Sequence, residues 1–195
     1  IMFHPFKGYW DLKHERKKTL APALVLVALL IISFITNSLY RGEFTNPVDP
    51  RYYNIFTDII KAILPIALWC VSSWCFTSLM DGKGTFKDIV TATCYAVIPM
   101  VVMYIPLTII SNFMVLDEIA FYTFFMTVAT VWMVGLIISG TMITNDYSFG
   151  KTVLTCILAV IGMGILVFIG LVFYSIIQQV VGFVLAIYSE ITFRL

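Results

Sequence analysis

Five long apolar runs dominate the chain, and each is long enough to cross a membrane as a single helix. A helix needs about 20 residues to span a hydrocarbon core about 30 Å thick. Short polar connectors separate the runs, which favours antiparallel neighbours within one bundle. The pattern therefore predicts an all-α fold, a polytopic membrane helical bundle with five transmembrane helices between residues 19 and 177. The runs are Leu20–Leu39, Ile59–Leu79, Ile89–Ile110, Ile119–Ile143 and Thr152–Ile177.

The two ends of the chain have a different, amphipathic pattern. In residues 1–18, Phe3, Phe6 and Trp10 fall on one helical face among lysines, which predicts a cytoplasmic interfacial helix. Residues 178–195 follow Gln178 and Gln179 and predict an amphipathic helix on the extracellular side. A continuation of the fifth helix against a partner and a sixth span are the alternatives. The apolar stripe of this segment consists of Val180, Phe183, Val184, Ile187, Tyr188 and Ile191.

The distribution of lysine and arginine predicts the orientation, because cytoplasmic segments carry an excess of these residues. With the N-terminus inside, eight basic residues are cytoplasmic and four are not. The multi-pass chain is then expected to have a cytoplasmic N-terminus and an extracellular C-terminus. The inner set is Lys7, Lys13, Arg16, Lys17, Lys18, Lys83, Lys87 and Lys151, and the outer set is Arg41, Arg51, Lys61 and Arg194.

Composition and charge argue against several classes of function. Apolar residues make up 61% of the chain and its net charge is +1, so nucleic-acid binding has no electrostatic basis. The middle of each span lacks charged residues, although proton-coupled transporters, pumps and voltage sensors need them. We find no hydrolase or metalloprotease motif, and we expect neither catalysis, a cofactor nor a metal site. The four cysteines lie inside apolar runs and are interpreted as buried thiols.

Small, polar and proline residues within the spans predict how the helices pack. The small residues Gly135, Ser139, Gly162 and Gly164 suit close contact, either within the chain or against another protein. Pro65, Pro99 and Pro106 each remove a backbone hydrogen bond, and are interpreted as kinks or as hinges. A polar cluster in the second span indicates either hydrogen bonds between helices or the lining of a solute path. That cluster is Ser72, Ser73, Thr77 and Ser78.

Two short connectors are predicted to face the cytoplasm and to contact a partner. Each combines an aromatic residue, a glycine and a lysine just before a helix. Exposed aromatic residues beside lysines are typical of recognition surfaces. The candidate contact residues are Gly82, Gly84, Phe86 and Lys87 in the first connector, and Tyr147, Phe149, Gly150 and Lys151 in the second.

Four segments follow one another along the chain: His4–Lys13, Asp81–Asp88, Tyr95-Ala96 with Pro99, and Tyr147–Thr152. Taken in this order, they resemble bacterial members of the Yip family, whose eukaryotic relatives are Rab-interacting proteins. The resemblance covers nearly the whole chain and its five spans, and it implies a non-enzymatic membrane adaptor. The Asp-Leu-Tyr-Gly-Pro motif of the eukaryotic proteins is missing, so a bacterial plasma membrane is favoured over the Golgi. Some bacterial members resemble small proteins that accompany carbohydrate ABC importers.

The residues and the resemblance together favour a non-catalytic scaffold or accessory subunit in contact with membrane lipids. Its expected partner is another integral membrane protein, such as the permease subunits of a carbohydrate ABC importer. A permease or channel that conducts a small solute itself is the alternative, and a lipid-modifying enzyme comes third.

Overall fold

The computed structural model describes residues 1–2, 4–14, 20–42 and 53–194, and its secondary structure in these ranges is helical. The described residues contain five candidate membrane spans, which confirms the predicted fold class. Phe3, the boundary at residue 18 and the loop over residues 43–52 lie outside the described residues. The spans are formed by α2 (Leu20–Tyr40), α3 (Ile55–Leu79), α4 (Phe86–Ala96) with α5 (Ile98–Ser111), α6 (Ile119–Asn145) and α7 (Phe149–Arg194).

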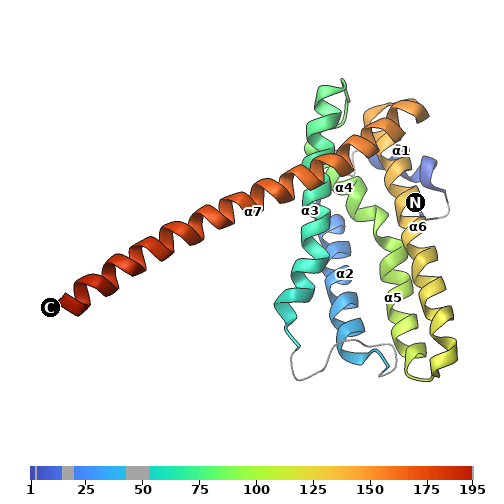
Figure 1. Cartoon of the computed structure of the whole chain (residues 1–195). Helices are drawn as coiled ribbons and strands as arrows, with labels where there is room; N and C mark the ends of the chain where they lie inside the picture. Colours follow the sequence, from blue (N-terminus) through green and yellow to red (C-terminus); the bar gives the residue numbers. More distant parts are fainter. Residues whose placement is uncertain (3, 15–19, 43–52, 195) are drawn as a thin grey trace.

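Helices α2 to α6 stand side by side, and α1 (Pro5–His14) lies against α6 at one end of the bundle (Figure 1). We call this end, which also carries residues 80–85 and 146–148, the α1 end. The opposite end carries residues 41–42 and the connector with η2 (Leu116–Glu118), and we call it the far end. There the amide of Gly42 donates to Ser111 Oγ over 3.0 Å. The chain therefore alternates between the two ends, as antiparallel spans require.

The third span is two helices rather than the single kinked helix that we predicted over Ile89–Ile110. The break falls at Val97, and Pro99 lies in the first turn of α5. A proline has no N–H to donate and its ring displaces the carbonyl four residues earlier, so α4 cannot continue through this point. By contrast, Pro65 and Pro106 lie inside α3 and α5, as predicted. Val97 packs into a buried cluster with Leu30 and Ala62, which stabilises the break.

Buried polar side chains join the helices at two levels of the bundle. Ser72 Oγ donates to the carbonyl of Ala159 over 2.6 Å, which connects α3 to α7. In the far half, the Asn37 amide donates to Thr108 Oγ1 and Tyr122 OH over 3.0 and 2.9 Å. Such bonds favour helix association in a membrane, where an unpaired polar group is costly. The interpretation of Ser72 as a contact between helices is therefore confirmed, and Asn37 is an additional contact that we did not predict.

Helix α7 is much longer than a membrane span and runs through the predicted boundary at residue 178. It contains 46 residues, equivalent to about 69 Å at 1.5 Å per residue. The segment 178–195 is therefore not a separate helix, and the continuation of the fifth helix is the alternative that the structure shows. α7 packs mainly against α3, crosses it obliquely and then projects away from the bundle (Figure 1). Every side chain over residues 167–187, which we call the α7 arm, is exposed.

Candidate functional site

The α1 end contains most of the predicted contact residues, and two similar helix ends form its framework. An aspartate in the left-handed conformation stands at the end of both α3 and α6. Asp81, with φ 57°, follows the C-cap of α3, and Asp146, with φ 56°, is the C-cap of α6. The amide of Gly82 then bonds back to Thr77 O over 2.8 Å, and that of Tyr147 to Met142 O over 3.0 Å. These are the backbone bonds of a Schellman motif, which reverses the chain at the end of a helix.

The two connectors hold each other in place through Asn145 and Tyr147. The Tyr147 hydroxyl lies 3.0 Å from Thr77 O and 3.1 Å from Met80 O, and the Gly84 amide donates to Asn145 Oδ1 over 3.3 Å. A Cβ atom at Gly82 would lie 2.6 Å from Asn145 Oδ1, and one at Gly84 would lie 2.8 Å from the same atom. Only glycine fits at both positions, because a larger residue would push the connectors apart.

This contact between the connectors corrects part of the predicted recognition surface. The Tyr147 side chain is only 7% exposed, and burial raises the pKa of its hydroxyl. Tyr147 is therefore not accessible to a partner, while Gly82 and Gly84 are half-buried and let the two connectors pack together. Asn145, which we did not single out, lies at the centre of the contact. An asparagine at the end of an apolar span was the available signal in the sequence.

Helix α1 is attached to the same end through Tyr9 and Lys13. The Tyr9 ring is 2% exposed, its hydroxyl donates to Ala92 O over 3.3 Å, and it lies against Gly140. Lys13 Nζ donates to Asp146 Oδ1 over 2.7 Å and to Ile143 O over 3.1 Å. A cation at the C-terminus of α6 satisfies a free carbonyl and complements the helix dipole. These contacts were not predicted, although Tyr9, a further aromatic residue beside Phe6 and Trp10, was their signal.

The electrostatics of this joint favour the ionised form of Asp146. The hydrogen bond from Lys13 lowers the pKa of the Asp146 carboxyl, opposed by partial desolvation, and the charge of Lys83 adds to the lowering. Lys83 Nζ lies 3.6 Å from Asp146 Oδ2. One carboxylate thus connects α1, the first connector and the end of α6.

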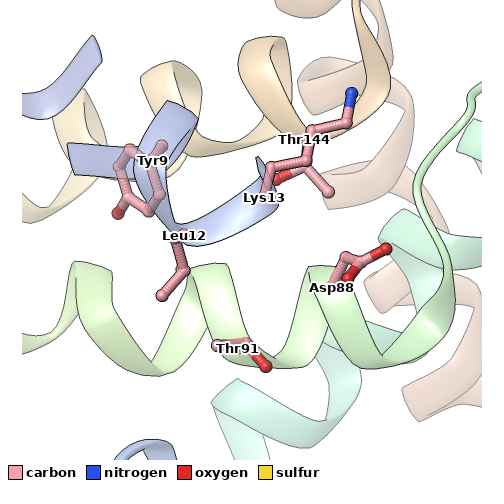
Figure 2. A pocket seen from close by; sticks show the side chains of 6 residues that line it. All are labelled: Tyr9, Leu12, Lys13, Asp88, Thr91 and Thr144. Carbon is pink, nitrogen blue, oxygen red and sulfur yellow. The ribbon is translucent and has the colours of Figure 1, made fainter. Parts of the chain in front are cut away.

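A small pocket lies between α1, α4 and α6, and it is lined by Tyr9, Leu12, Lys13, Asp88, Thr91 and Thr144 (Figure 2). The Lys13 side chain extends away from Asp88 toward the end of α6, and Asp88 instead forms a capping box with Thr85. The cavity holds about 20 Å³, which is room for about one water molecule. The pocket is therefore a feature of a joint between helices and is too small for a metabolite.

The remaining candidate residues of the α1 end are accessible from outside. Phe86 is 42% exposed and packs edge-on against Trp74, and Phe149 is 69% exposed. Lys87 and Gly150 are exposed as well, and Lys151 Nζ lies 4.5 Å from the centre of the Tyr147 ring. Among the residues that the structure describes, no group of three or more His, Cys, Asp or Glu side chains could hold a metal ion.

The predicted helix-packing residues separate into one internal contact and several open positions. A Cβ atom at Gly162 would collide with Ser72 Oγ and with the Phe76 ring, so Gly162 allows α7 to approach α3. Around Gly135 and Gly164 a Cβ atom would meet nothing within 4 Å. Ser139 donates to Gly135 O on its own helix. For Gly135 and Gly164, contact with another molecule is the interpretation that remains.

These features define a multi-span, all-helical membrane protein whose short connectors are joined at one end. The chain belongs to the Yip1 domain family, since the model of that domain matches residues 1–171. The matched region ends within α7, near the start of the exposed arm. A search of curated proteins finds no match to this chain, and a search of solved structures finds none either.

Proposed function

We propose that this chain is a non-catalytic accessory subunit that assembles with another integral membrane protein through the α7 arm. Yip1-domain proteins are generally non-catalytic membrane proteins, which agrees with the proposal. The observation that carries it is that every side chain over residues 167–187 is exposed, so the rest of the chain leaves the apolar surface of the α7 arm uncovered. Contiguous apolar surface that extends beyond the hydrocarbon core is typical of an interaction site.

The length of α7 supports this proposal, because the helix is more than one crossing requires. Its apolar part, Phe149–Ile187, contains 39 residues, about 58 Å of helix against a hydrocarbon core of about 30 Å. An upright α7 would place much of the arm in water, and an oblique one would carry it sideways away from its own bundle. In both arrangements the arm reaches a neighbour that the other spans cannot reach.

Polar side chains on the arm favour a protein neighbour over lipid alone. Gln178 Nε2 donates to Tyr174 OH over 2.7 Å, and Gln179 Nε2 lies 3.5 Å from Ser175 Oγ. A glutamine amide has two donor hydrogens and an acceptor oxygen, so each retains capacity for bonds to a second helix. The open surfaces at Gly135 and Gly164 would allow a second helix to approach closely.

The accessible residues of the α1 end, Phe86, Lys87, Phe149 and Gly150, are then available to the same partner or to a peripheral subunit. By the excess of lysine and arginine, we place the α1 end in the cytoplasm of a bacterium and the far end outside. A permease subunit of a carbohydrate ABC importer is the first partner to test, because of the resemblance to proteins that accompany such importers.

Photocrosslinking in native membranes tests the proposal. A photoreactive amino acid is placed at Leu171 or Phe183 on the arm, and at Leu24 on α2 as a matched control that is similarly exposed but lies in the bundle. We expect both arm positions to crosslink to one defined multi-span protein, and Leu24 to give only lipid adducts. If the partner also contacts α6, Gly135→Leu should weaken its binding. Crosslinks from the arm to lipid alone, or only to a second copy of this chain, would refute the proposal.

A further inference from the structure

An apolar groove is lined by residues of α3, α6 and α7 and, in its first part, also by residues of α2, α4 and α5. It lies where α7 packs mainly against α3 instead of along α6. The groove consists of two adjoining cavities of about 300 and 360 Å³ that share Trp69 and Ile137 in their walls. The first lies beside the break at Val97, and the second lies beside Cys156 near the start of α7. Volumes of this size are typical of sites that hold a small ligand.

The chemistry of the lining indicates the part of a ligand that would fill the groove. Within the second cavity the walls are side chains such as Val134, Ile138 and Val160. An unfilled apolar space loses the dispersion contacts of all the atoms that surround it. Acyl chains surround a membrane bundle on every side, and a single chain is slender enough for these cavities. A helix, at about 10 Å across, is too wide for them.

One charged side chain, Lys61, lines the first cavity. It is the seventh residue of α3, about 9 Å along the helix from the far end. Its side chain is 56% exposed, and its ammonium forms an ion pair with the buried Asp58 carboxylate, 3.4 Å from Oδ1, which leaves other N–H donors of the ammonium for a phosphate. A lysine in this position can extend its ammonium to the headgroup layer while its methylenes stay in the apolar region. In addition, Pro65 has no N–H to donate to the carbonyl of Lys61.

We propose that the groove binds one phospholipid from the leaflet at the far end, with an acyl chain along Trp69 and Ile137 and its phosphate at Lys61. The positive charge of Lys61 complements the phosphate, and the apolar walls complement the chain. The site is separate from the α7 arm and from the α1 end, so it does not depend on the proposed assembly function.

Native mass spectrometry of the delipidated chain in mild detergent tests this site, with phosphatidylglycerol as the probe and diacylglycerol with the same acyl chains as the neutral comparison. Ile137→Phe fills the point where the two cavities meet. Val131→Phe is the matched control, since Val131 is exposed on the same helix outside the groove. We expect Ile137→Phe to lower the affinity of the first bound molecule of both lipids about tenfold, and Val131→Phe to leave it unchanged.

Lys61→Gln tests the headgroup contact. We expect it to lower the affinity for phosphatidylglycerol about threefold, the scale of an exposed ion pair, and to leave diacylglycerol unaffected. If Ile137→Phe does not fold, as judged by thermal unfolding, Val134→Phe at the exposed wall of the second cavity replaces it. Equal lipid binding by the groove variant and the control would overturn the site, because it would indicate annular lipid. If the wild-type chain forms a dimer and the groove variant does not, the groove holds a second copy of the chain, which would overturn the site as well. An unchanged affinity of Lys61→Gln for phosphatidylglycerol would overturn the phosphate contact.

Discussion

Gly162 and Gly135 offer a matched pair of substitutions for testing the contact between α3 and α7. A methyl group at Gly162 would collide with Ser72 Oγ and with the Phe76 ring, whereas the same group at Gly135 would enter open space. Gly162→Ala therefore has to displace Ser72, whose hydroxyl donates to Ala159 O over 2.6 Å. Gly135→Ala changes no contact within the described residues.

The magnitudes follow from two separate costs at Gly162. Forcing an extra carbon into a packed contact costs about 1–3 kcal/mol, and the loss of the Ser72 hydrogen bond adds about 1 kcal/mol. We expect Gly162→Ala to lower the free energy of unfolding by about 2–4 kcal/mol, or Tm by roughly 4–16 °C for a chain of this size. Gly135→Ala should be neutral or slightly stabilising, because alanine is the better helix former by about 1 kcal/mol.

The assay is thermal unfolding of both variants in the same detergent, followed by circular dichroism. Ser72→Ala in the Gly162→Ala background serves as a further control, since removal of the hydroxyl relieves part of the collision and should recover part of the lost Tm. Equal Tm values for Gly162→Ala and Gly135→Ala would refute the close contact between α3 and α7. The same result would remove the geometric reason for the groove beside α7.

Three further predictions concern the α1 end and the third span. Asp146→Asn should loosen the attachment of α1, because it removes the ion pair with Lys13. Lys13 depresses the pKa of the Asp146 carboxyl below its ordinary value of 3.8, so in the wild type the ion pair stabilises α1 above that pH and this stabilisation is lost as the pH falls further. Protease accessibility of α1 against pH measures this, and an identical pH profile in the variant would contradict it. Pro99→Ala should leave membrane insertion intact but lower the free energy of unfolding by about 1–2 kcal/mol through a partly unfilled space, as a denaturation curve would show; an unchanged midpoint would count against this. Cysteines at Ser148 and Phe113, both exposed, should react with an impermeant reagent from the cytoplasm and from outside, respectively, and the reverse pattern would overturn the proposed orientation.

The apolar runs alone determined the class of fold, because an uncharged stretch of about 20 residues has few stable environments other than a bilayer. Their number and the fold class agree with the structure without tertiary information, whereas the break at Val97 and the continuation of the fifth helix beyond residue 177 do not follow from the runs. The exposure of Phe6, Trp10, Phe86 and Phe149 also follows from local pattern. Each of these inferences rests on free energies of transfer that depend on composition over a short segment of chain.

Tertiary structure decided which residues of the same kind are buried and which are open. Gly162 and Gly135 are equivalent as small residues in a span, but only the direction of α7 places one of them against α3. Tyr147 and Phe149 are both aromatic residues of one connector, and Tyr147 is buried because Thr77 and Met80 offer carbonyl groups to its hydroxyl. Lys13 and Asp146 are 133 positions apart. Such contacts depend on the crossing of distant helices, which the period of apolar residues within one helix does not encode.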